Sequence, residues 1–492
     1  IKSDDVLDKT LNAMLATYDP HSNYFPPVDA MELNRQTTLQ LEGIGVSIRP
    51  DRGNEDYTKI ETIVDGGPAS KTGQVKSGDR IIGVAQDGEK MVDVIGWPSS
   101  EIVGLIRGKR GTKVTVKLLG AGAAMSQARS VTIVRDVIQE EDAGVRSRTV
   151  EITRDGKKHI FGVVEIPSFY LNYRARRAGA DYRSVSEDTN KALQALANKN
   201  VEGIIIDLRN NPGGSLEEVA KMLGQVIKSG PVVQIRDGNG NVSVFEDTDG
   251  GKQTYAGPLA VMINLASASA SEIYSAAIQD YGRGIVIGST TTGKGTAQVQ
   301  LDTLAHGQAT LTQRKFYRVT GGSTQNKGVI PDIKLVDIYD EEFGERKAKN
   351  ALVWDTIATT PFKREGEIES YIPSLSAKSK QRVDADAQFE YLEARKMIAQ
   401  VAKEQKKIVL DIDKRKAELI ALEQKTLDAE NKRRTETGKK PYPNWESYQA
   451  SMDALVESRS KIKANQRPAL PEEETFVTEA ANVLLDLNHL KK

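Results

Sequence analysis

The chain has 492 residues, with 68 basic and 68 acidic side chains and no cysteine. At roughly 100–200 residues per domain, this length predicts about three domains. The balanced charge argues against a nucleic-acid-binding protein, which usually carries a basic excess, and the lack of cysteine excludes disulfides, thiolate nucleophiles and cysteine-ligated metals. The most apolar stretch, residues 258–266, is far too short to cross a bilayer, so no membrane span is predicted.

Residues 1–35 are predicted to form an N-terminal helical segment. The run from Asp19 to Pro27 ends the helix with turn-forming residues. A helix this short cannot bury an apolar face by itself, so we expect it to pack on something else, as part of a larger helical domain with residues upstream. Its apolar residues recur at helical spacing, at Val6, Leu7, Leu11 and Leu15.

Residues 36–138 are predicted to form a small β-rich domain. Gly-rich turns separate runs of β-type residues, and a helical pattern covers residues 92–107. Strands are expected at 44–48, 58–64, 80–84, 113–119 and 130–134.

Residues 139–339 alternate strands with helices, which predicts an α/β core. Residues 201–208 are nearly all apolar, as in a strand buried on both faces. A capping box of Ser215 and Glu218 is predicted to begin one helix. Helices are expected at 184–198, 215–228 and 272–281, and further strands at 160–166, 231–235, 259–264 and 283–288.

Residues 340–492 are predicted to form a charged, helical C-terminal domain. The run 435–443 breaks the helical pattern. These helices could simply buttress the core, or they could form a platform for a partner or a wall of a substrate cage. A heptad-like spacing predicts one long helix with an apolar seam through Val401, Ile408, Ile412 and Leu419.

The histidines do not form a metal-binding or catalytic pattern. They are scattered and lie in no metal-ligating motif, so ordinary polar or capping roles are expected and no metal or cofactor is predicted. A Gly-x-Ser-x-Gly elbow is also absent. The four histidines are His21, His159, His306 and His489.

Two further motifs are near misses. Residues 288–296 almost spell a phosphate loop, but Gly295 stands where Ser or Thr should bind Mg²⁺, and the following residues favour a strand over a helix. Ser458 and Lys461 match Ser-x-x-Lys, and Lys71-Thr-Gly matches a second motif of the penicillin-recognising enzymes. Because the first pair lies in the charged tail, without a Ser-Asp-Asn motif, we reject this reading.

Lys294 lies between two glycines, which is unusual for a solvated lysine. Glycines allow close backbone packing and could aim the side chain inward, where burial lowers the pKa of an amine. A lysine that is neutral at physiological pH can act as a general base.

A matching nucleophile could come from the run Ser267-Ala-Ser-Ala-Ser-Glu272, which follows a predicted strand and opens a helix. The structural interpretation is a capping box of Ser269 and Glu272. The chemical interpretation is a serine beside free amides at a helix N-terminus, where the N–H of Ala270 could stabilise an oxyanion.

A second source of amides is the Gly-rich turn after the strand that ends at Leu208. Gly213 and Gly214 would expose N–H groups at the carboxyl end of the sheet, where the sites of α/β proteins lie. A plain turn is the alternative. Asp207 and Arg209 are expected to form a structural ion pair.

In combination, these motifs resemble the carboxyl-terminal processing proteases of peptidase family S41, in their tail-specific branch. The resemblance rests on residues 207–214, 267–272, 293–298 and 315–333 and covers about residues 15–335. It implies a multidomain α/β protein whose core is crotonase-like and related to ClpP, with an inserted PDZ domain and helical flanking regions.

The resemblance also assigns roles to residues. It makes Ser269 the nucleophile, Lys294 the general base and Gln298 the residue that positions the lysine. Four residues apart on a strand, Lys294 and Gln298 share a face. The oxyanion hole would use the N–H of Ala270 and one from the glycine turn, Gly214 being favoured over Gly213.

Residues 36–138 resemble a bacterial PDZ domain, which binds the C-terminus of a peptide. Glycines let consecutive amides point at a carboxylate, and an open strand edge pairs with the ligand backbone. The residues 66–81 match a later turn and strand, and residues 92–107 would wall the pocket for an apolar side chain. The expected carboxylate loop consists of Leu41, Gly43, Ile44, Gly45 and Val46.

The sequence therefore predicts a serine endopeptidase that selects substrates by their C-termini. The resemblance implies a periplasmic location, protein substrates with exposed apolar C-termini and a lipoprotein adaptor as a partner. It implies no cofactor. The alternatives are a catalytically inactive peptide-binding scaffold and a crotonase-like acyl-CoA enzyme, which would not explain Ser269 together with Lys294.

Overall fold

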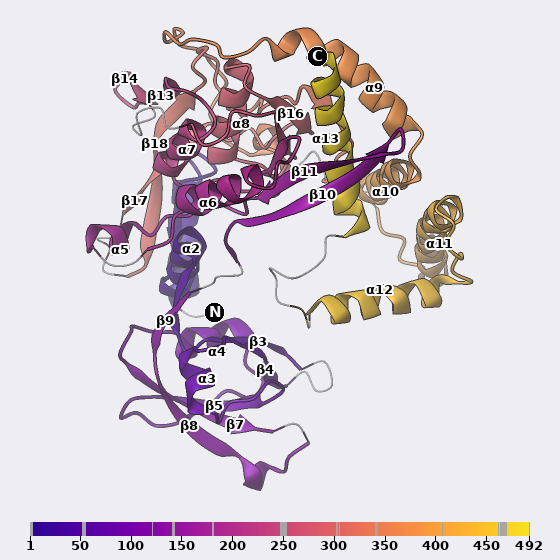
Figure 1. Cartoon of the computed structure of the whole chain (residues 1–492). Coiled ribbons are helices and arrows are strands. Elements are labelled where there is room, and N and C mark those ends of the chain that lie inside the picture. Colours follow the sequence, from indigo (N-terminus) through magenta and orange to yellow (C-terminus); the bar gives the residue numbers. More distant parts are fainter. Residues whose placement is uncertain are drawn as a thin grey trace. The chain divides into compact units, whose positions relative to one another are not determined.

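The computed structural model describes residues 3–491 except 52–55, 121, 140–142, 180–181, 247–252, 302–303, 305, 340–342, 406, 461 and 463–469. The chain divides into two compact units (Figure 1). One comprises residues 27–141, and the other comprises residues 1–26 together with 142–492. We call them the small unit and the large unit. Lys461, of the rejected Ser-x-x-Lys motif, lies outside the described residues.

The small unit is an antiparallel sheet with the order β3-β4-β5-β7-β8, with β6 paired to β5. Alternating apolar residues from these strands form its core with helix α4. A separate strand pair, β2 with β9, joins the two ends of the unit. The strands are β2 (Gln40–Gly43), β3 (Val46–Pro50), β4 (Thr58–Ile63), β5 (Arg80–Gln86), β6 (Val92–Asp93), β7 (Lys113–Leu119), β8 (Arg129–Val134) and β9 (Asp136–Gln139).

The helices of the small unit differ from the predictions at their starts. The helix predicted over 92–107 begins only at Ser99, because Val92 and Asp93 pair as β6 and Pro98 sets the turn that precedes it. The boundary expected between residues 35 and 36 falls inside a helix that belongs to this unit. The helices are α2 (Pro27–Thr38), α3 (Pro68–Thr72), η1 (Met125–Gln127) and α4 (Ser99–Ile106).

The centre of the large unit is a six-stranded sheet with the order β10-β11-β12-β15-β16-β19. All neighbours pair in parallel except β10 with β11. The apolar run predicted to be buried on both faces is β12, and each of its residues is buried. The strands are β10 (Arg146–Arg154), β11 (Lys157–Glu165), β12 (Ile204–Asp207), β15 (Leu259–Ile263), β16 (Ile285–Gly288) and β19 (Ile333–Lys334).

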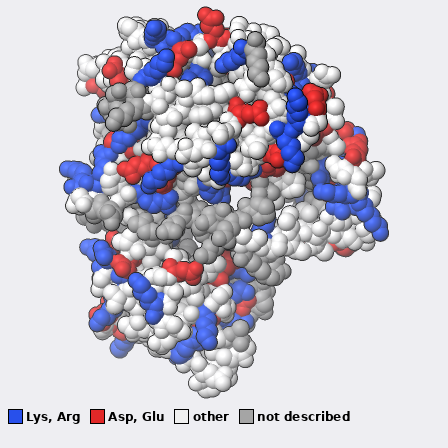
Figure 2. All heavy atoms as spheres, viewed as in Figure 1, with Lys and Arg blue, Asp and Glu red and all other residues white. Residues whose placement is uncertain are grey.

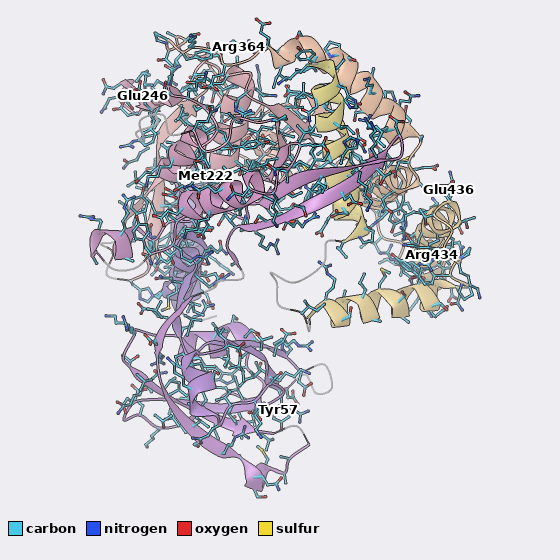
Figure 3. The ribbon with its side chains drawn as sticks, in the orientation of Figure 1. Tyr57, Met222, Glu246, Arg364, Arg434 and Glu436 are labelled. Atoms are coloured by element: carbon cyan, nitrogen blue, oxygen red, sulfur yellow. The ribbon has the colours of Figure 1, made fainter. Side chains whose placement is uncertain are left out.

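Helices cover both faces of this sheet (Figure 1). On one face, Gly162 of β11 leaves room for Leu196 of α6, and Gly284 before β16 leaves room for Ile278 of α8. Met222 of α7, labelled in Figure 3, is buried in the same helix layer. The helices of this layer are α6 (Val185–Ala197), α7 (Leu216–Gly224) and α8 (Ala270–Asp280), and the short helix α5 (Tyr173–Arg177) precedes them in the chain.

The helix predicted over 215–228 ends at Gly224, and its capping box is incomplete. Ser215 caps the helix by accepting from the N–H of Glu218. The Glu218 carboxylate, however, is fully buried and accepts from the N–H of Ser186 on the neighbouring helix. The glutamate therefore joins two helices instead of closing its own.

The opposite face of the sheet is covered by the end of the chain. Val477, Leu484 and Leu487 of α13 are buried against strands β10, β11, β12 and β15. The charged C-terminal segment thus supplies part of the core, and the structure groups it with the large unit. The helices are η4 (Glu345–Lys347), η5 (Ile368–Tyr371), α9 (Ile372–Asp384), α10 (Ala387–Glu404), α11 (Ile412–Glu436), α12 (Trp445–Ser460) and α13 (Pro471–Leu490).

The predicted heptad seam is wrong. The helix ends at Glu404, and Asp411 begins a new helix by accepting from the N–H groups of Asp413 and Lys414. The seam residues are consequently solvent-exposed, at 55% for Val401 and 69% for Ile408. A strong cap between two helical runs outweighs an apolar repeat that has no partner to bury it. Ile412 and Leu419 are exposed in the same way.

A second, antiparallel sheet of the large unit brings the N-terminal segment to the rest of the unit. Its order is β1-β18-β13-β14, and β17 pairs with β18. The strand predicted after the phosphate-loop near miss is β17, which confirms that no helix opens there. Helix α1 (Ser3–Leu15) leads into β1 (Asn23–Phe25); the others are β13 (Pro231–Asp237), β14 (Val242–Glu246), β17 (Thr296–Leu301) and β18 (Gln308–Tyr317).

The surface carries no segregated charge on the face shown in Figure 2, where basic and acidic side chains are interspersed. This agrees with the equal numbers of the two kinds in the sequence. Among the described residues, no helix is long and apolar enough to cross a membrane.

Candidate active site

Three serines lie at the turn between β15 and α8, and the structure separates their roles. Ser267 and Ser271 are fully buried, and their hydroxyls donate to the backbone oxygens of Leu208 at 2.8 Å and Asn211 at 3.0 Å. Ser269 is only half-buried, and among the described residues its hydroxyl makes no hydrogen bond. The hydroxyls of the two outer serines therefore stabilise the turn by hydrogen bonds, whereas the hydroxyl of Ser269 is not used in this way.

The backbone of Ser269 is strained, with φ 55° and ψ −110°. L-residues rarely adopt this conformation, and where it persists the surrounding structure must enforce it. A strained strand-to-helix turn that exposes a serine is the arrangement of a nucleophile elbow. This chain forms such a turn without the Gly-x-Ser-x-Gly motif.

Glu272 is a fully buried carboxylate that joins the serine turn to the lysine segment. Its Oε2 accepts from the N–H of Ser269 at 2.8 Å and from the N–H of Lys294 at 2.9 Å. Its Oε1 accepts from Gly293 N–H at 2.7 Å and Thr291 Oγ1 at 2.6 Å. Burial raises the pKa of Glu272 to about 7, and these hydrogen bonds oppose the rise.

The predicted capping box is thus only half formed. Glu272 accepts from the Ser269 backbone as predicted, but Ser269 gives no side-chain cap in return. Instead, one oxygen atom holds the backbones of Ser269 and Lys294, so the two residues are neighbours in space.

The Lys294 amine is held by two acceptors. It donates to Gln298 Oε1 at 2.7 Å and to the backbone oxygen of Thr296 at 3.2 Å. Burial lowers the pKa of Lys294, although the carboxylates of Glu345, Glu272 and Asp19 act in the opposite direction. Among the described residues, no hydrogen bond joins this amine to Ser269, so proton transfer would require the two side chains to approach each other.

The flanking glycines pack as the sequence predicts. A Cβ atom on Gly295 would lie 2.7 Å from the backbone nitrogen of Gln325, and one on Gly293 would lie 3.0 Å from the carbonyl carbon of Asn326. Gly293 also has φ +88°. The lysine segment is therefore pressed against residues 325–328 with no room for side chains.

The Gly-Gly turn lies directly beside the serine. A Cβ atom on Gly213 would lie 2.8 Å from Cβ of Ser269. The N–H of Gly213 already donates to Asn211 Oδ1 at 2.8 Å, whereas the N–H groups of Gly214 and Ala270 have no acceptor among the described residues. Of the two glycines, therefore, only Gly214 has an N–H group that is not already engaged within the described part of the chain.

Asp207 and Arg209 form the structural ion pair that the sequence predicts. Arg209 Nη2 lies 2.7 Å from Asp207 Oδ2, and its guanidinium stacks at 5.3 Å over the ring of Phe476 on α13. The pair anchors the strand end to the C-terminal helix.

The sequence does not predict a group of residues that lie around Lys294. Asp19 and Glu345 are both buried, and each contacts the site through an amide or hydroxyl side chain. Glu345 accepts from Gln325 Nε2 at 2.9 Å, and Gln325 Oε1 accepts from the N–H of Gly295 at 2.7 Å. His21, expected to be an ordinary polar residue, lies 2.7 Å from Glu345. No local pattern marks these residues, because they come from distant segments.

In the small unit, the predicted carboxylate loop lines one cavity of about 350 Å³. Val103 and Ile106 of α4 form an apolar wall of this cavity. Among the described residues, the N–H groups of Ile44 and Gly45 have no acceptor. The loop residues in the lining are Leu41, Gly43, Ile44, Gly45 and Val46.

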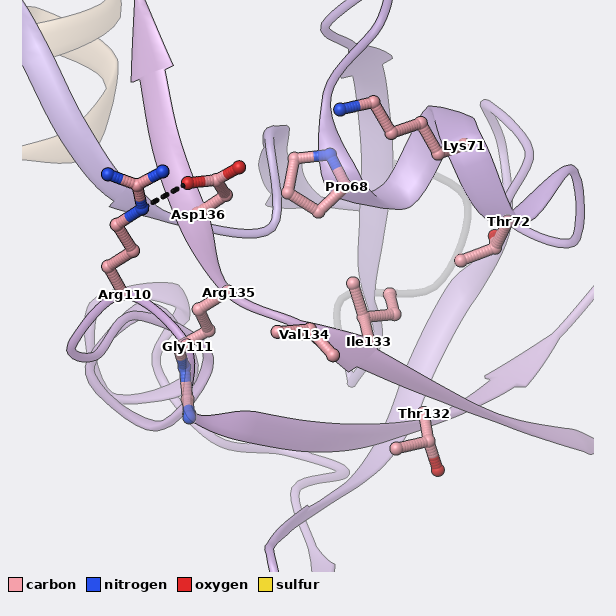
Figure 4. A pocket seen from close by; sticks show the side chains of 10 residues that line it. All are labelled: Pro68, Lys71, Thr72, Arg110, Gly111, Thr132, Ile133, Val134, Arg135 and Asp136. Atoms are coloured by element: carbon pink, nitrogen blue, oxygen red, sulfur yellow. Dashed lines mark ion pairs between the residues drawn. The ribbon is translucent and has the colours of Figure 1, made fainter.

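Charged side chains border the same cavity. Glu32 of α2 pairs with Arg35 at 2.6 Å and with Arg107, at the end of α4, at 3.1 Å. These hydrogen bonds hold the pKa of Glu32 at about 2. A second cavity of about 470 Å³ lies between Pro68, Thr132 and the ion pair of Arg110 with Asp136 (Figure 4).

Within the described ranges, no group of three or more histidine, aspartate or glutamate residues could hold a metal ion. The candidate site comprises Ser269, Lys294 and Gln298, together with the N–H groups of Gly214 and Ala270.

Comparison with known proteins matches three family models to this chain. Residues 160–335 match peptidase family S41, residues 338–489 match the C-terminal domain of tail specific protease, and residues 32–119 match the PDZ domain. The matches confirm the predicted architecture, in which an S41 core accompanies a PDZ domain.

Curated relatives of this chain are named as tail-specific or carboxy-terminal-processing proteases. The tail-specific protease of Haemophilus influenzae is 38% identical over 451 residues, which cover 89% of this chain and 62% of that protein. The carboxy-terminal-processing protease of Bartonella bacilliformis is 28% identical over 338 residues, which cover 69% of this chain and 71% of the relative. The chain therefore spans less than two thirds of the Haemophilus protein.

Two of the solved structures that are similar to this chain come from proteases. The photosystem II D1 C-terminal processing protease is 25% identical, with 70% of this chain and 86% of that chain covered and a TM-score of 0.38. The PDZ domain of the carboxy-terminal protease from Vibrio cholerae, in complex with a peptide, is 46% identical, with 20% and 98% covered and a TM-score of 0.19.

Proposed function

Because this chain belongs to peptidase family S41 and carries the C-terminal domain of the tail-specific proteases, we propose that it is a serine endopeptidase with a Ser269–Lys294 dyad. Gln298 assists the lysine, and the PDZ domain selects substrates by their C-termini. The observation that carries the proposal is the shared Glu272 oxygen, which makes a serine with an unpaired hydroxyl the neighbour of a lysine with a lowered pKa.

The geometry supports an acyl-transfer mechanism. Ser269 Oγ attacks the carbonyl carbon of the peptide bond, and its proton passes to the neutral Lys294 amine. The negative charge that develops on the carbonyl oxygen is stabilised by the N–H groups of Gly214 and Ala270. The Lys294 ammonium then protonates the leaving amine, and water hydrolyses the acyl-enzyme with Lys294 again taking the proton.

A substitution at the glycine turn tests the oxyanion hole. Gly214 has φ +142°, and a Cβ atom there would lie 2.3 Å from the backbone oxygen of Phe169. Gly214→Ala must therefore move its own N–H, and we expect kcat to fall by about 10²–10³. Steady-state kinetics on an unfolded protein substrate measures this effect.

The control for this experiment is Gly240→Ala. Gly240 also has a positive φ, +88°, but a Cβ atom there would meet nothing within 4 Å. Alanine there also adopts a left-handed backbone conformation, and the kcat of this variant should stay at the wild-type level. A Gly214→Ala enzyme that folds and retains full kcat would exclude this donor.

The PDZ cavity supports recognition of a free C-terminus. The N–H groups of Ile44 and Gly45 are available to a carboxylate, and the guanidinium of Arg107 borders the same cavity. The wall formed by Val103 and Ile106 fits an apolar terminal side chain.

Amidation of the substrate C-terminus should raise KM by about tenfold or more, because the amide lacks the charge that the loop would bind. The measurement compares the free acid and the amide of one peptide that carries both the tail and the cleavage site. Gly45→Ala should remove most of this preference, since Gly45 has φ +77° and Ile138 would lie 3.2 Å from the new Cβ. Gly66→Ala, at φ +71° with open space, should retain it. Equal KM values for acid and amide would reject the role in recognition.

The remaining parts of the proposal rest on resemblance. A periplasmic location and a lipoprotein adaptor are expected of a tail-specific protease, and cell fractionation tests the first of these. Degradation of casein would separate the proposed protease from a catalytically inactive scaffold.

A further inference from the structure

Asp19 is a buried carboxylate that lies close to the lysine but belongs to a distant part of the chain. It follows α1, is 3% exposed, and reaches the site because β1 pairs with β18. Its Oδ2 accepts from Ser22 Oγ at 2.6 Å, and its Oδ1 accepts from the N–H groups of His21 and Ser22 at 2.8 and 3.1 Å. These hydrogen bonds, together with one from Thr312, hold the pKa of Asp19 below its usual value, so the group is ionised.

The hydroxyl of Thr312 stands between Asp19 and Gln298. Thr312 Oγ1 lies 2.8 Å from Asp19 Oδ1 and 2.9 Å from Gln298 Nε2. A hydroxyl has one hydrogen, and an ionised carboxylate can only accept. Thr312 must therefore donate to Asp19, which leaves its lone pairs to accept from the side-chain amide of Gln298.

This requirement fixes which end of the Gln298 amide faces the lysine. The NH₂ group is held by Thr312 Oγ1 and by Thr296 Oγ1 at 3.0 Å, so the Oε1 atom points to the Lys294 amine. In the opposite orientation, the NH₂ group would donate to the lone pair of the neutral amine. That lone pair is what must receive the proton of Ser269.

The two acceptors on the amine determine where its lone pair points. A neutral amine has two hydrogens, and Gln298 Oε1 and the Thr296 oxygen can take both. The lone pair is then directed away from both acceptors and stays available.

We propose that Asp19, acting through Thr312, is a positioning residue that sets the orientation of the Gln298 amide and so keeps the Lys294 amine a hydrogen-bond donor to Gln298 and a base toward Ser269. The inference rests on the proposed Ser269–Lys294 dyad.

The negative charge of Asp19, taken by itself, would hinder Lys294 from acting as a base. A carboxylate near an amine favours the ammonium form, which is not a base. A purely electrostatic role would therefore make the Asp19→Ala enzyme active at lower pH, with its maximal kcat retained. The positioning role predicts instead a lower kcat at every pH in Asp19→Ala, because Thr312 then has no carboxylate to donate to and its hydroxyl proton can turn toward Gln298.

The sharpest test compares two substitutions at Thr312 with one at Thr310. Thr312→Val keeps the shape of the side chain but removes the hydroxyl, and we expect kcat to fall about 10²-fold with KM little changed. Thr312→Ser retains the hydroxyl and should keep kcat within about threefold of wild type.

Thr310→Val is the matched control on the same strand. Its hydroxyl donates to the backbone oxygen of His21 at 3.2 Å, so this variant loses a contact with the same N-terminal segment. The hydrogen bonds that Thr312 makes with Asp19 and Gln298 stay intact. The kcat of Thr310→Val should also stay within about threefold of wild type. Labelling of Ser269 by an organophosphorus probe should slow in Thr312→Val in parallel with kcat, as a readout independent of peptide binding.

The outcomes separate the positioning role from its alternatives. A folded Thr312→Val enzyme with wild-type kcat, or equal losses in Thr312→Val and Thr310→Val, would overturn the proposal. If Thr312→Val fails to fold, the pH profile of Asp19→Ala decides, since a shifted profile with an unchanged maximum would also overturn the proposal. Failure of the dyad itself is recognised separately, by activity that survives Ser269→Ala.

Discussion

Ser269→Ala is expected to abolish peptide-bond cleavage and to leave the fold unchanged. The substitution removes the only atom proposed to attack the carbonyl carbon, and kcat should fall by about 10⁴-fold or more. Because the hydroxyl makes no hydrogen bond among the described residues, its loss leaves no buried partner unsatisfied. Thermal unfolding and casein degradation measure the two effects on one preparation.

The neighbouring serines provide the matched controls. Ser267→Ala and Ser271→Ala each remove a fully buried hydroxyl that donates to a backbone oxygen. Each should cost about 1–3 kcal/mol of the free energy of unfolding, because that oxygen loses its donor. The pattern should therefore be inverted, with activity lost at Ser269 and stability lost at the other two positions. Cleavage by a folded Ser269→Ala enzyme would reject the mechanism.

Lys294→Met is expected to be as inactive as Ser269→Ala. Methionine keeps the length of the side chain but cannot take the proton of the serine. The pKa of Lys294 is lowered by burial, so the protein binds fewer protons at this site when folded than when unfolded. Stability therefore rises with pH between the lowered pKa and the usual value, and Lys294→Met should unfold at the same or a higher temperature at neutral pH.

The same shift sets the pH dependence of the wild-type enzyme. In the proposed mechanism the neutral amine is the active form, so kcat should rise about tenfold per pH unit below the lowered pKa of Lys294 and level off above it. The pH profile of single-turnover cleavage gives the measurement. Lys294→Arg, which stays protonated throughout, should show no rising limb. A flat wild-type profile from pH 5 to 9 would contradict the assignment.

The sequence predicts the elements that carry the chemistry, because their signals are local. Strand β12 is a continuous apolar run, and the glycines beside Lys294 mark a segment without room for side chains. The choice of Ser269 among three serines is different in kind. Physical reasoning can distinguish Ser269 only once the structure shows that Ser267 and Ser271 use their hydroxyls in hydrogen bonds.

What the sequence could not predict depends on contacts between distant segments. Asp19 lies in a run that indicates only the end of a helix, and its role appears when β1 pairs with β18. Glu272 has the spacing of a capping residue, but burial against Gly293 and Lys294 turns it into a link between two segments. The heptad around Val401 failed because periodicity shows that a helix can have an apolar face, and does not show that anything covers it.

Helix α13 has a consequence for how the protein is made. Ala480, Val483 and Leu484 fill the core beneath strands that are synthesised hundreds of residues earlier. Such contacts between remote parts of a chain slow folding, and a ribosome adds only about 5–20 residues per second. The part of the sheet face that α13 covers therefore stays exposed for many seconds, until translation approaches residue 490. A prematurely terminated chain would lack this cover and would leave the apolar residues beneath α13 exposed to water.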